Sequence, residues 1–383
     1  MIYLDNAATT FPKPDCVKNA MSDCMRCFAA NPGRGSHRLS ARAGEILFDA
    51  RETLAAFFGG SPERVVFTLN CTQAINYALK GVLKKGDHIV ISSLEHNAVY
   101  RPLFRMQQDG LIEFDTANVV PGSDAKTVQN FAGLIKENTR MIFTTHVSNV
   151  FGTELPVAAL SELARKNGLL FGLDAAQSAG IYPIDMQARQ IDLLCMPGHK
   201  GLLGPMGTGV FMFGQAVDPA PIMEGGTGSL SLQAAQPAEY PDRLESGTVN
   251  LPGIAGLCEG VQFLRRIGGP EAVHDKEMRL VRSLKEGLHN IPGAKVFDHM
   301  QSDDGALLSF NVENQPAEET ALLLSRCGLA VRGGYHCAAL AHESAGTAAL
   351  GTVRVSPGYF NTIKQIKSFI FSVNQIALKK KIC

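Results

Sequence analysis

The chain has 383 residues, in which 36 lysines and arginines balance 36 aspartates and glutamates. This length suits two domains, or one large domain with a smaller lobe. The balanced charge includes no basic excess and no acidic tail, so we expect no nucleic-acid partner. No apolar run approaches the ~18 residues of a membrane span, and the first residues lack the basic and apolar regions of a secretory signal.

The first two thirds of the chain alternate short apolar runs with helix-like stretches. Such alternation predicts an α/β fold with a largely parallel sheet covered by helices on both faces. Ligands of such sheets gather at the carboxyl ends of the strands, and the sequence places Thr72, His96, Asn149, Asp174 and Lys200 there. The predicted strands are 65–68, 88–92, 141–145, 169–174, 192–196 and 208–213, and the predicted helices are 72–83 and 157–167.

Segment 218–241 is rich in Pro, Gly, Ala and Gln, so it is predicted to be an excursion or an active-site loop. Beyond it, helices are predicted at 256–267, 277–290 and 318–327, and strands at 306–311 and 352–356. We therefore predict a large α/β domain over 15–250. A smaller α+β domain would be formed by 1–14 and 251–383.

Lys200 lies on the turn Gly198-His199-Lys200-Gly201, after the apolar run 192–196, and Asp174 closes the preceding apolar run. A lysine that forms an imine and an aspartate that keeps a pyridine nitrogen protonated are what pyridoxal 5′-phosphate (PLP) requires. Taken alone, Lys200 could equally be a solvated lysine on a turn, and Asp174 a cap at a strand end. The order Asp174, Gln177, His199, Lys200, followed by a glycine-rich entry into a strand, favours the cofactor site.

Cys337 stands in the segment Arg332-Gly333-Gly334-Tyr335-His336-Cys337-Ala338. The thiolate is the nucleophilic form of cysteine, and neighbouring cations favour it. Arg332 and His336 are close enough in sequence to supply that charge. A reactive cysteine beside a cofactor lysine indicates sulfur chemistry on an amino acid.

The nine cysteines are an odd number scattered along a long chain, which predicts reduced thiols in a cytoplasmic protein. Cys24 and Cys27 have the spacing of a metal or redox pair, but no second pair accompanies them, so we interpret the spacing as incidental and expect no metal site. Cys383 follows three lysines and is predicted to lie in a frayed tail. Four further cysteines are predicted to be buried apolar fillers: Cys16, Cys195, Cys258 and Cys327.

Seven motifs spread along the chain carry a family resemblance: residues 3–10, 95–98, 146–149, 174–178, 198–200, 245–248 and 332–338. With them the chain resembles a class V PLP-dependent aminotransferase-fold enzyme, and within that family a cysteine desulfurase. The last motif resembles the loop of the second desulfurase group, which includes SUF-type and selenocysteine lyase-like proteins. The resemblance implies PLP-dependent transferase fold type I, with the cysteine loop on the smaller domain.

The resemblance also implies roles for individual residues. Lys200 is similar to the lysine that carries the cofactor and moves the Cα proton, Cys337 to the nucleophile, and His96 to the imidazole stacked on the cofactor ring. Cofactor-binding roles fall on Cys71, Thr72, Asn149, Asp174, Gln177, His199 and Thr248. Substrate-binding roles fall on Asn6, Asn149, Arg332 and Arg354.

Two of these roles have a clear physical basis. The backbone N–H groups at the start of the predicted helix beside Thr72 can hold a phosphate. The guanidinium fork of Arg354 suits a carboxylate, although an arginine without this context would be interpreted as part of a surface ion pair.

Thr248 is similar to a residue that reaches the phosphate of the neighbouring subunit, which implies a homodimer with shared sites.

The sequence departs from the family pattern at three places. Pro197 stands where a serine or threonine usually supplies a phosphate hydroxyl. Asn70 and Cys71 replace a small glycine-containing pair, and Tyr335 stands where many relatives have histidine.

The function predicted from these residues is an L-cysteine desulfurase that forms L-alanine and a persulfide on Cys337, for delivery to a protein acceptor. Two alternatives share the fold: a selenocysteine lyase acting on L-selenocysteine, and a β-eliminating C–S lyase. An alternative of another class is a non-catalytic PLP protein that binds a sulfur carrier. Lys200, Asp174 and Cys337 together argue against the last.

Overall fold

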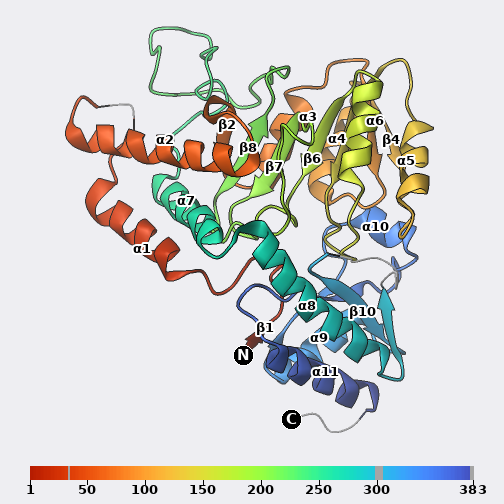
Figure 1. Ribbon diagram of the computed structural model, residues 1–383. Helices are drawn as coiled ribbons and strands as arrows, with labels where there is room; N and C mark the ends of the chain where they lie inside the picture. Colours follow the sequence, from red (N-terminus) through yellow and green to blue (C-terminus); the bar gives the residue numbers. More distant parts are fainter. Residues whose placement is uncertain (33–34, 298–304, 380–383) are drawn as a thin grey trace.

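The computed structural model describes residues 1–32, 35–297 and 305–379. A larger α/β part and a smaller α+β lobe lie next to each other, and the carboxyl edge of the large sheet faces the lobe (Figure 1). The α/β fold with a mostly parallel sheet, expected from the sequence, is confirmed.

The larger part is built on a seven-stranded sheet with the order β2-β8-β7-β6-β5-β3-β4. β8 alone runs in the reverse direction, antiparallel to β2 and β7, while the other neighbours are parallel. Most of these strands are short apolar runs, as strands buried on both faces require. Their bounds are β2 Val65–Thr68, β3 His88–Ser92, β4 Glu113–Ala117, β5 Thr139–Thr145, β6 Leu170–Asp174, β7 Leu193–Pro197 and β8 Gly209–Phe213.

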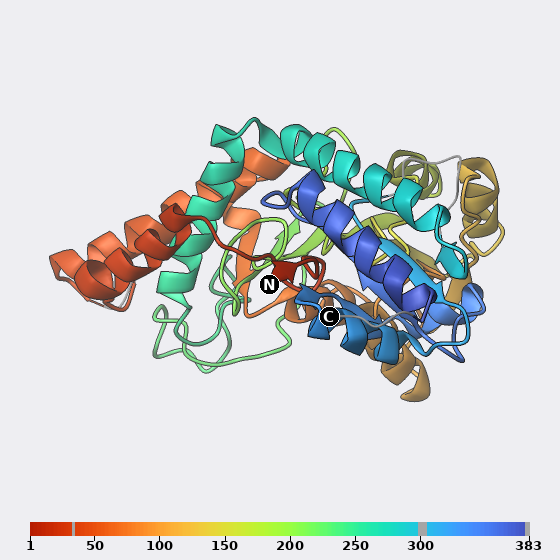
Figure 2. The same cartoon turned by 90° about the horizontal axis from the view of Figure 1, so that it is seen from below.

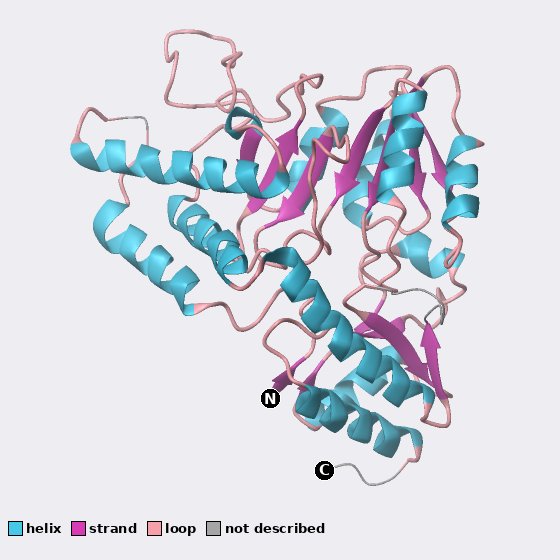
Figure 3. Ribbon diagram, in the orientation of Figure 1, coloured by secondary structure: helices cyan, strands magenta, loops and turns pink. Residues whose placement is uncertain are grey.

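Helices cover both faces of this sheet (Figure 3). One face packs against α3 (Cys71–Lys80) and α4 (Asn97–Gln108). The other face packs against α2 (Arg38–Phe58), α5 (Asp124–Ala132), α6 (Val157–Lys166) and α7 (Leu251–Arg266). Helix α1 (Asp15–Asp23) and the π-helical turn η1 (Cys24–Phe28) pack on α7, and a 3-10 turn, η2 (Pro62–Arg64), precedes β2.

The smaller lobe holds an antiparallel sheet with the order β12-β13-β10-β9. Leucines, valines and phenylalanines of this sheet and of three helices form its separate apolar core. The strands are β9 Ala294–Phe297, β10 Leu308–Val312, β12 Arg332–Gly334 and β13 Thr352–Val355. The helices of this core are α8 Gly269–His289, α9 Ala317–Arg326 and α11 Ile363–Ala377, and the short helix α10 spans Ala339–Ser344.

The first ten residues join the two parts. β1 (Ile2–Tyr3) pairs in parallel with β11 (Leu329–Ala330) of the smaller lobe. The hydroxyl of Thr10 then donates to the carbonyl of Lys200 at 3.0 Å. Figure 2, seen from below, shows this segment crossing the centre of the molecule.

The predicted elements agree with the observed ones in type, and several strand bounds coincide, such as 65–68 and 88–92. Segment 218–241 contains no helix or strand, as expected of a loop. The division at residue 250 stays a prediction; α7, just beyond it, packs against α1 and α2 of the larger part.

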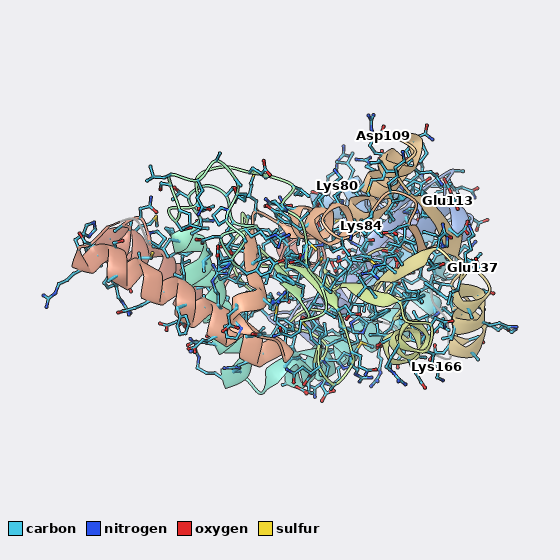
Figure 4. All side chains as sticks on the ribbon, turned by 90° about the horizontal axis from the view of Figure 1, so that it is seen from above. Lys80, Lys84, Asp109, Glu113, Glu137 and Lys166 are labelled. Carbon is cyan, nitrogen blue, oxygen red and sulfur yellow. The ribbon has the colours of Figure 1, made fainter. Side chains whose placement is uncertain are left out.

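The edge of the large sheet opposite the smaller lobe is charged. The side chains labelled in Figure 4 lie at the ends of α3, α4 and α6 and at or just before the starts of β3, β4 and β5: Lys80, Lys84, Asp109, Glu113, Glu137 and Lys166. Within the described residues, no helix is long and apolar enough to cross a membrane.

Candidate active site

A cavity of about 240 Å³ at the carboxyl edge of the large sheet gathers most of the predicted site residues. They come from the starts of α3 and α4, the ends of β6 and β7, and the smaller lobe, so only the folded chain brings them together. The predicted residues that line it are Cys71, Thr72, His96, Asn149, Asp174, Gln177, His199, Lys200, Arg332, Cys337 and Arg354.

In this cavity Asp174 is buried and Lys200 is partly buried. Burial, helped by the nearby charge of Arg354, lowers the pKa of Lys200, which favours the neutral amine that can act as a nucleophile or base. Asp174 ends β6, and its Oδ1 accepts a hydrogen bond from the Ala176 N–H at 2.8 Å. Burial raises the pKa of Asp174, whereas the Ala176 N–H and Lys200 act in the opposite direction.

His96 stands at the start of α4 with its ring fixed by the backbone. Its Nδ1 accepts from the Ala98 N–H at 3.0 Å. Burial, with the nearby charge of Lys200, lowers the pKa of His96 to about 4, so the ring is neutral at pH 7 and carries its proton on Nε2. Gln177 donates from Nε2 to the carbonyl of Ala7 at 3.1 Å, which sets the direction of its amide.

The end of the cavity at α3 has the features of an anion site. Asn70 caps α3 by accepting from the Gln73 N–H at 3.0 Å, and Thr72 in the first turn is exposed. The Nδ1 atom of His199 is buried without a hydrogen-bond partner among the described residues. Burial lowers the pKa of His199 to about 4. Pro197, the last residue of β7, lines the cavity but has no hydroxyl to offer an anion.

Arg354 is 2% exposed and only partly satisfied. Its Nη1 donates to the carbonyl of Asn149 at 2.9 Å, and its Nη2 to Asp5 Oδ1 at 2.8 Å. The Nε atom is buried and has no partner in the described part of the chain. The alternative of a surface ion pair is therefore wrong. Asp5 was not among the predicted site residues, although it lies within the motif at residues 3–10.

Hydrogen bonds to two successive carbonyls, those of His336 and Cys337, hold the loop that carries Cys337. His336 and Cys337 both have left-handed backbone, with φ of 50° and 58°, a conformation that costs about 1–3 kcal/mol for a residue other than glycine. The His336 carbonyl accepts from Asn149 Nδ2 at 2.6 Å. The Cys337 carbonyl accepts from the Asn97 N–H at 2.7 Å, and the Cys337 side chain itself is exposed.

The expectation that His336 supplies positive charge to Cys337 is wrong. Its Nε2 lies 3.0 Å from the Thr352 carbonyl. Burial, with the charge of Arg354, lowers the pKa of His336 to about 3, so the ring is neutral at physiological pH. Arg332, which lines the same cavity, remains as a cation from this segment.

Two predicted site residues lie outside the cavity. The side chain of Asn6 hydrogen-bonds to the backbone. Its Nδ2 donates to the Ser356 carbonyl at 2.9 Å, and its Oδ1 accepts from the Phe11 N–H at 3.2 Å. Thr248 lines a separate cavity together with Arg51 and Glu245. Its contact with a neighbouring subunit stays a prediction.

The remaining cysteines differ in burial. Cys195 and Cys258 are buried as expected of apolar fillers, whereas Cys16 and Cys327 are only half-buried. Cys24 is buried and Cys27 exposed, and within the described ranges no cluster of three or more His, Cys, Asp or Glu could hold a metal ion. Cys383 lies outside the described residues.

Comparisons with known proteins show the family of this chain. Residues 2–369 match the family described as Aminotransferase class-V. A probable cysteine desulfurase of Methanothermobacter thermautotrophicus is 34% identical, over 98% of this chain and 94% of its own length. A cysteine desulfurase of Salmonella agona is 31% identical, over 98% and 93% of the two chains. The apo structure of a cysteine desulfurase from Thermococcus onnurineus superimposes with a TM-score of 0.91 at 29% identity, covering 99% of this chain and 95% of that one.

Proposed function

Because the chain belongs to the class V aminotransferase family, and within it to the cysteine desulfurases, we propose that it converts L-cysteine to L-alanine with PLP as cofactor and Cys337 as sulfur acceptor. The observation that carries this proposal is that one cavity holds a partly buried lysine, a buried arginine whose Nε has no partner among the described residues, and an exposed cysteine. The lysine suits the cofactor aldehyde and the substrate Cα proton, the arginine the substrate carboxylate, and the cysteine the substrate sulfur.

The residues of the cavity fit PLP on their own chemistry. Asp174 lacks a protein donor at Oδ2 among the described residues, which leaves this oxygen for a protonated ring nitrogen. His199 Nδ1 is buried and has no partner in the described ranges, and the start of α3 has N–H groups suited to a phosphate. Lys200 would bind the cofactor covalently and His96 would cover its ring. Bound PLP supplies an electron sink for negative charge on the substrate Cα.

The residues of the chain perform the other steps. The guanidinium of Arg354 holds the substrate carboxylate through Nε, and Lys200, as a neutral amine, takes the Cα proton. The Cys337 thiolate attacks the substrate sulfur, so an S–S bond forms as the Cβ–S bond breaks. Proton return to the carbon fragment gives alanine, and Cys337 keeps the sulfur as a persulfide.

The test is a single turnover with L-cysteine. Mass spectrometry should find one added sulfur on Cys337, and alanine should form in equal amount. Cys337→Ala should still bind PLP but lose alanine formation. If Cys337→Ala makes alanine at the wild-type rate, the desulfurase mechanism is wrong; sulfide with pyruvate instead of alanine would identify the β-eliminating lyase.

The quaternary and cellular context is part of the same proposal. Thr248 would reach the cofactor phosphate of a second copy, and a protein with a nucleophilic cysteine would accept the sulfur from the exposed Cys337. Selenocysteine would fit the same cavity as cysteine. The cytoplasm is the proposed compartment because the cysteine pattern predicts reduced thiols.

A further inference from the structure

Cys71 places a second thiol in the active-site cavity. It is the first residue of α3 and is buried. Its Sγ lies 3.6 Å from Oδ1 of Asp174, and both side chains line the cavity. The contact joins two segments 103 residues apart in the sequence.

The direction of this hydrogen bond follows from the surroundings. Burial, with the carboxylate of Asp174, raises the pKa of Cys71 well above its ordinary value. The thiol therefore keeps its proton at physiological pH, and the S–H group donates to the carboxylate oxygen. A thiol held in this form is a poor nucleophile, so Cys71 is not a second sulfur carrier.

The Cys71–Asp174 hydrogen bond helps to set the orientation of the Asp174 carboxylate. Oδ1 accepts from both Cys71 Sγ and the Ala176 N–H, whereas Oδ2 receives no donor from the described residues. Two donors on one oxygen fix the rotation of the carboxylate and leave the other oxygen for a ligand. Both donors also oppose the effect of burial on the ionisation of Asp174.

We propose that Cys71 is a positioning residue that, by S–H donation to Oδ1, keeps the Asp174 carboxylate ionised and turns its Oδ2 toward the ring nitrogen of the cofactor. This proposal rests on the proposed function, because it requires PLP in the cavity. Cys71, the first residue of α3, departs from the family pattern, and the proposal assigns it a role.

Cys195 is a matched control. It faces Asp174 in register on the neighbouring strand β7 and is fully buried. Its pKa is also raised by burial. No hydrogen bond joins it to Asp174 within the described part of the chain, so Cys195→Ala removes the same atoms without removing a donor.

The experiment compares Cys71→Ala, Cys71→Ser and Cys195→Ala with the wild type in the absence of cysteine. The readouts are the dissociation constant for PLP and the pH midpoint of the visible absorbance of the bound cofactor. Losing a hydrogen bond of ~0.5–1.5 kcal/mol should weaken PLP binding about two- to tenfold in Cys71→Ala and move the absorbance midpoint. Cys71→Ser, which keeps a donor, and Cys195→Ala should stay near wild type.

Two results would overturn the inference while leaving the proposed function intact. One is a Cys71→Ala variant that matches Cys195→Ala in both readouts. The other is a Cys71→Ser variant as defective as Cys71→Ala, which would show that shape and not donation matters. A wild-type protein that binds no PLP at Lys200 would overturn both the inference and the proposed function.

Discussion

Asp5 joins the active site only because the fold brings it next to Arg354. Its carboxylate pairs with Arg354 across 349 residues of sequence. Asp5→Ala should remove the carboxylate that supports the guanidinium we assign to the substrate carboxylate. A hydrogen bond to a charged group contributes ~1.5–3 kcal/mol, so the KM for cysteine should rise at least about tenfold, with the absorbance of the bound cofactor unchanged. A KM within twofold of wild type would show that Arg354 needs no help from Asp5.

Burial of Glu277, on α8, should make the free energy of unfolding depend on pH. It is 4% exposed, and burial raises its pKa from 4.5 to about 8. The folded chain therefore holds a proton that the unfolded chain releases above pH 4.5. Stability from this group is fully present below pH 4.5 and is lost as the pH rises to about 8, by up to ~1.4 kcal/mol per pH unit.

Glu277→Gln should remove this contribution. Urea unfolding should show a higher midpoint than wild type at pH 8 and a shallower loss of stability between pH 5 and 8. Glu95, whose pKa burial also raises to about 8, remains in both proteins, so some slope should persist. Identical slopes in the two proteins would mean that Glu277 does not hold its proton in the folded state.

At the scale of elements, the loop that carries Cys337 depends on Asn149. Its side chain holds the His336 carbonyl, and its own carbonyl holds Arg354, so one residue links the nucleophile to the carboxylate site. Asn149→Ala should let the loop relax from its left-handed backbone. Displacement of a reacting group by about 1 Å can cost up to 10²-fold, so persulfide formation at saturating cysteine should slow by about ten- to a hundredfold. An unchanged single-turnover rate would contradict the role of this contact.

Several strands of the large sheet could be predicted because their local sequence pattern alone indicates a buried strand. Val65–Thr68 and His88–Ser92 are continuous apolar runs that suit a strand buried on both faces. β4 was not predicted, because Glu113–Ala117 lies at the sheet edge and keeps polar, partly exposed residues. The two-residue strands β1 and β11 are defined only by their pairing with each other, which no local pattern reveals.

The same distinction applies to the site. Residues at strand ends, such as Asp174 and Lys200, could be predicted because the ends of parallel strands meet at one edge. The Asp5–Arg354 pair and the Cys71–Asp174 bond depend on contacts between distant segments. The neutral state of His336 depends on burial, so its position next to Cys337 in the sequence was misleading.

At the scale of the whole molecule, the predicted dimer can be tested through Thr248. Thr248→Val should leave the oligomeric state unchanged and weaken PLP binding about two- to tenfold, if its hydroxyl reaches the phosphate of the partner subunit. Analytical ultracentrifugation and cofactor titration measure the two quantities. A fully active wild-type monomer would contradict shared sites.

The segment from Ile2 to Thr10 has a consequence for the newborn chain. It is synthesised long before its partners, which are Lys200, Leu329–Ala330 and Ser356. At ~5–20 residues per second, it must wait on the order of tens of seconds for them. Chains arrested before residue 329 should therefore fail to retain PLP after borohydride reduction; covalent retention by such chains would contradict this order of assembly. The cavity would then be completed only after residue 356 has been made, so a polypeptide that stops earlier releases no reactive sulfur into the cell.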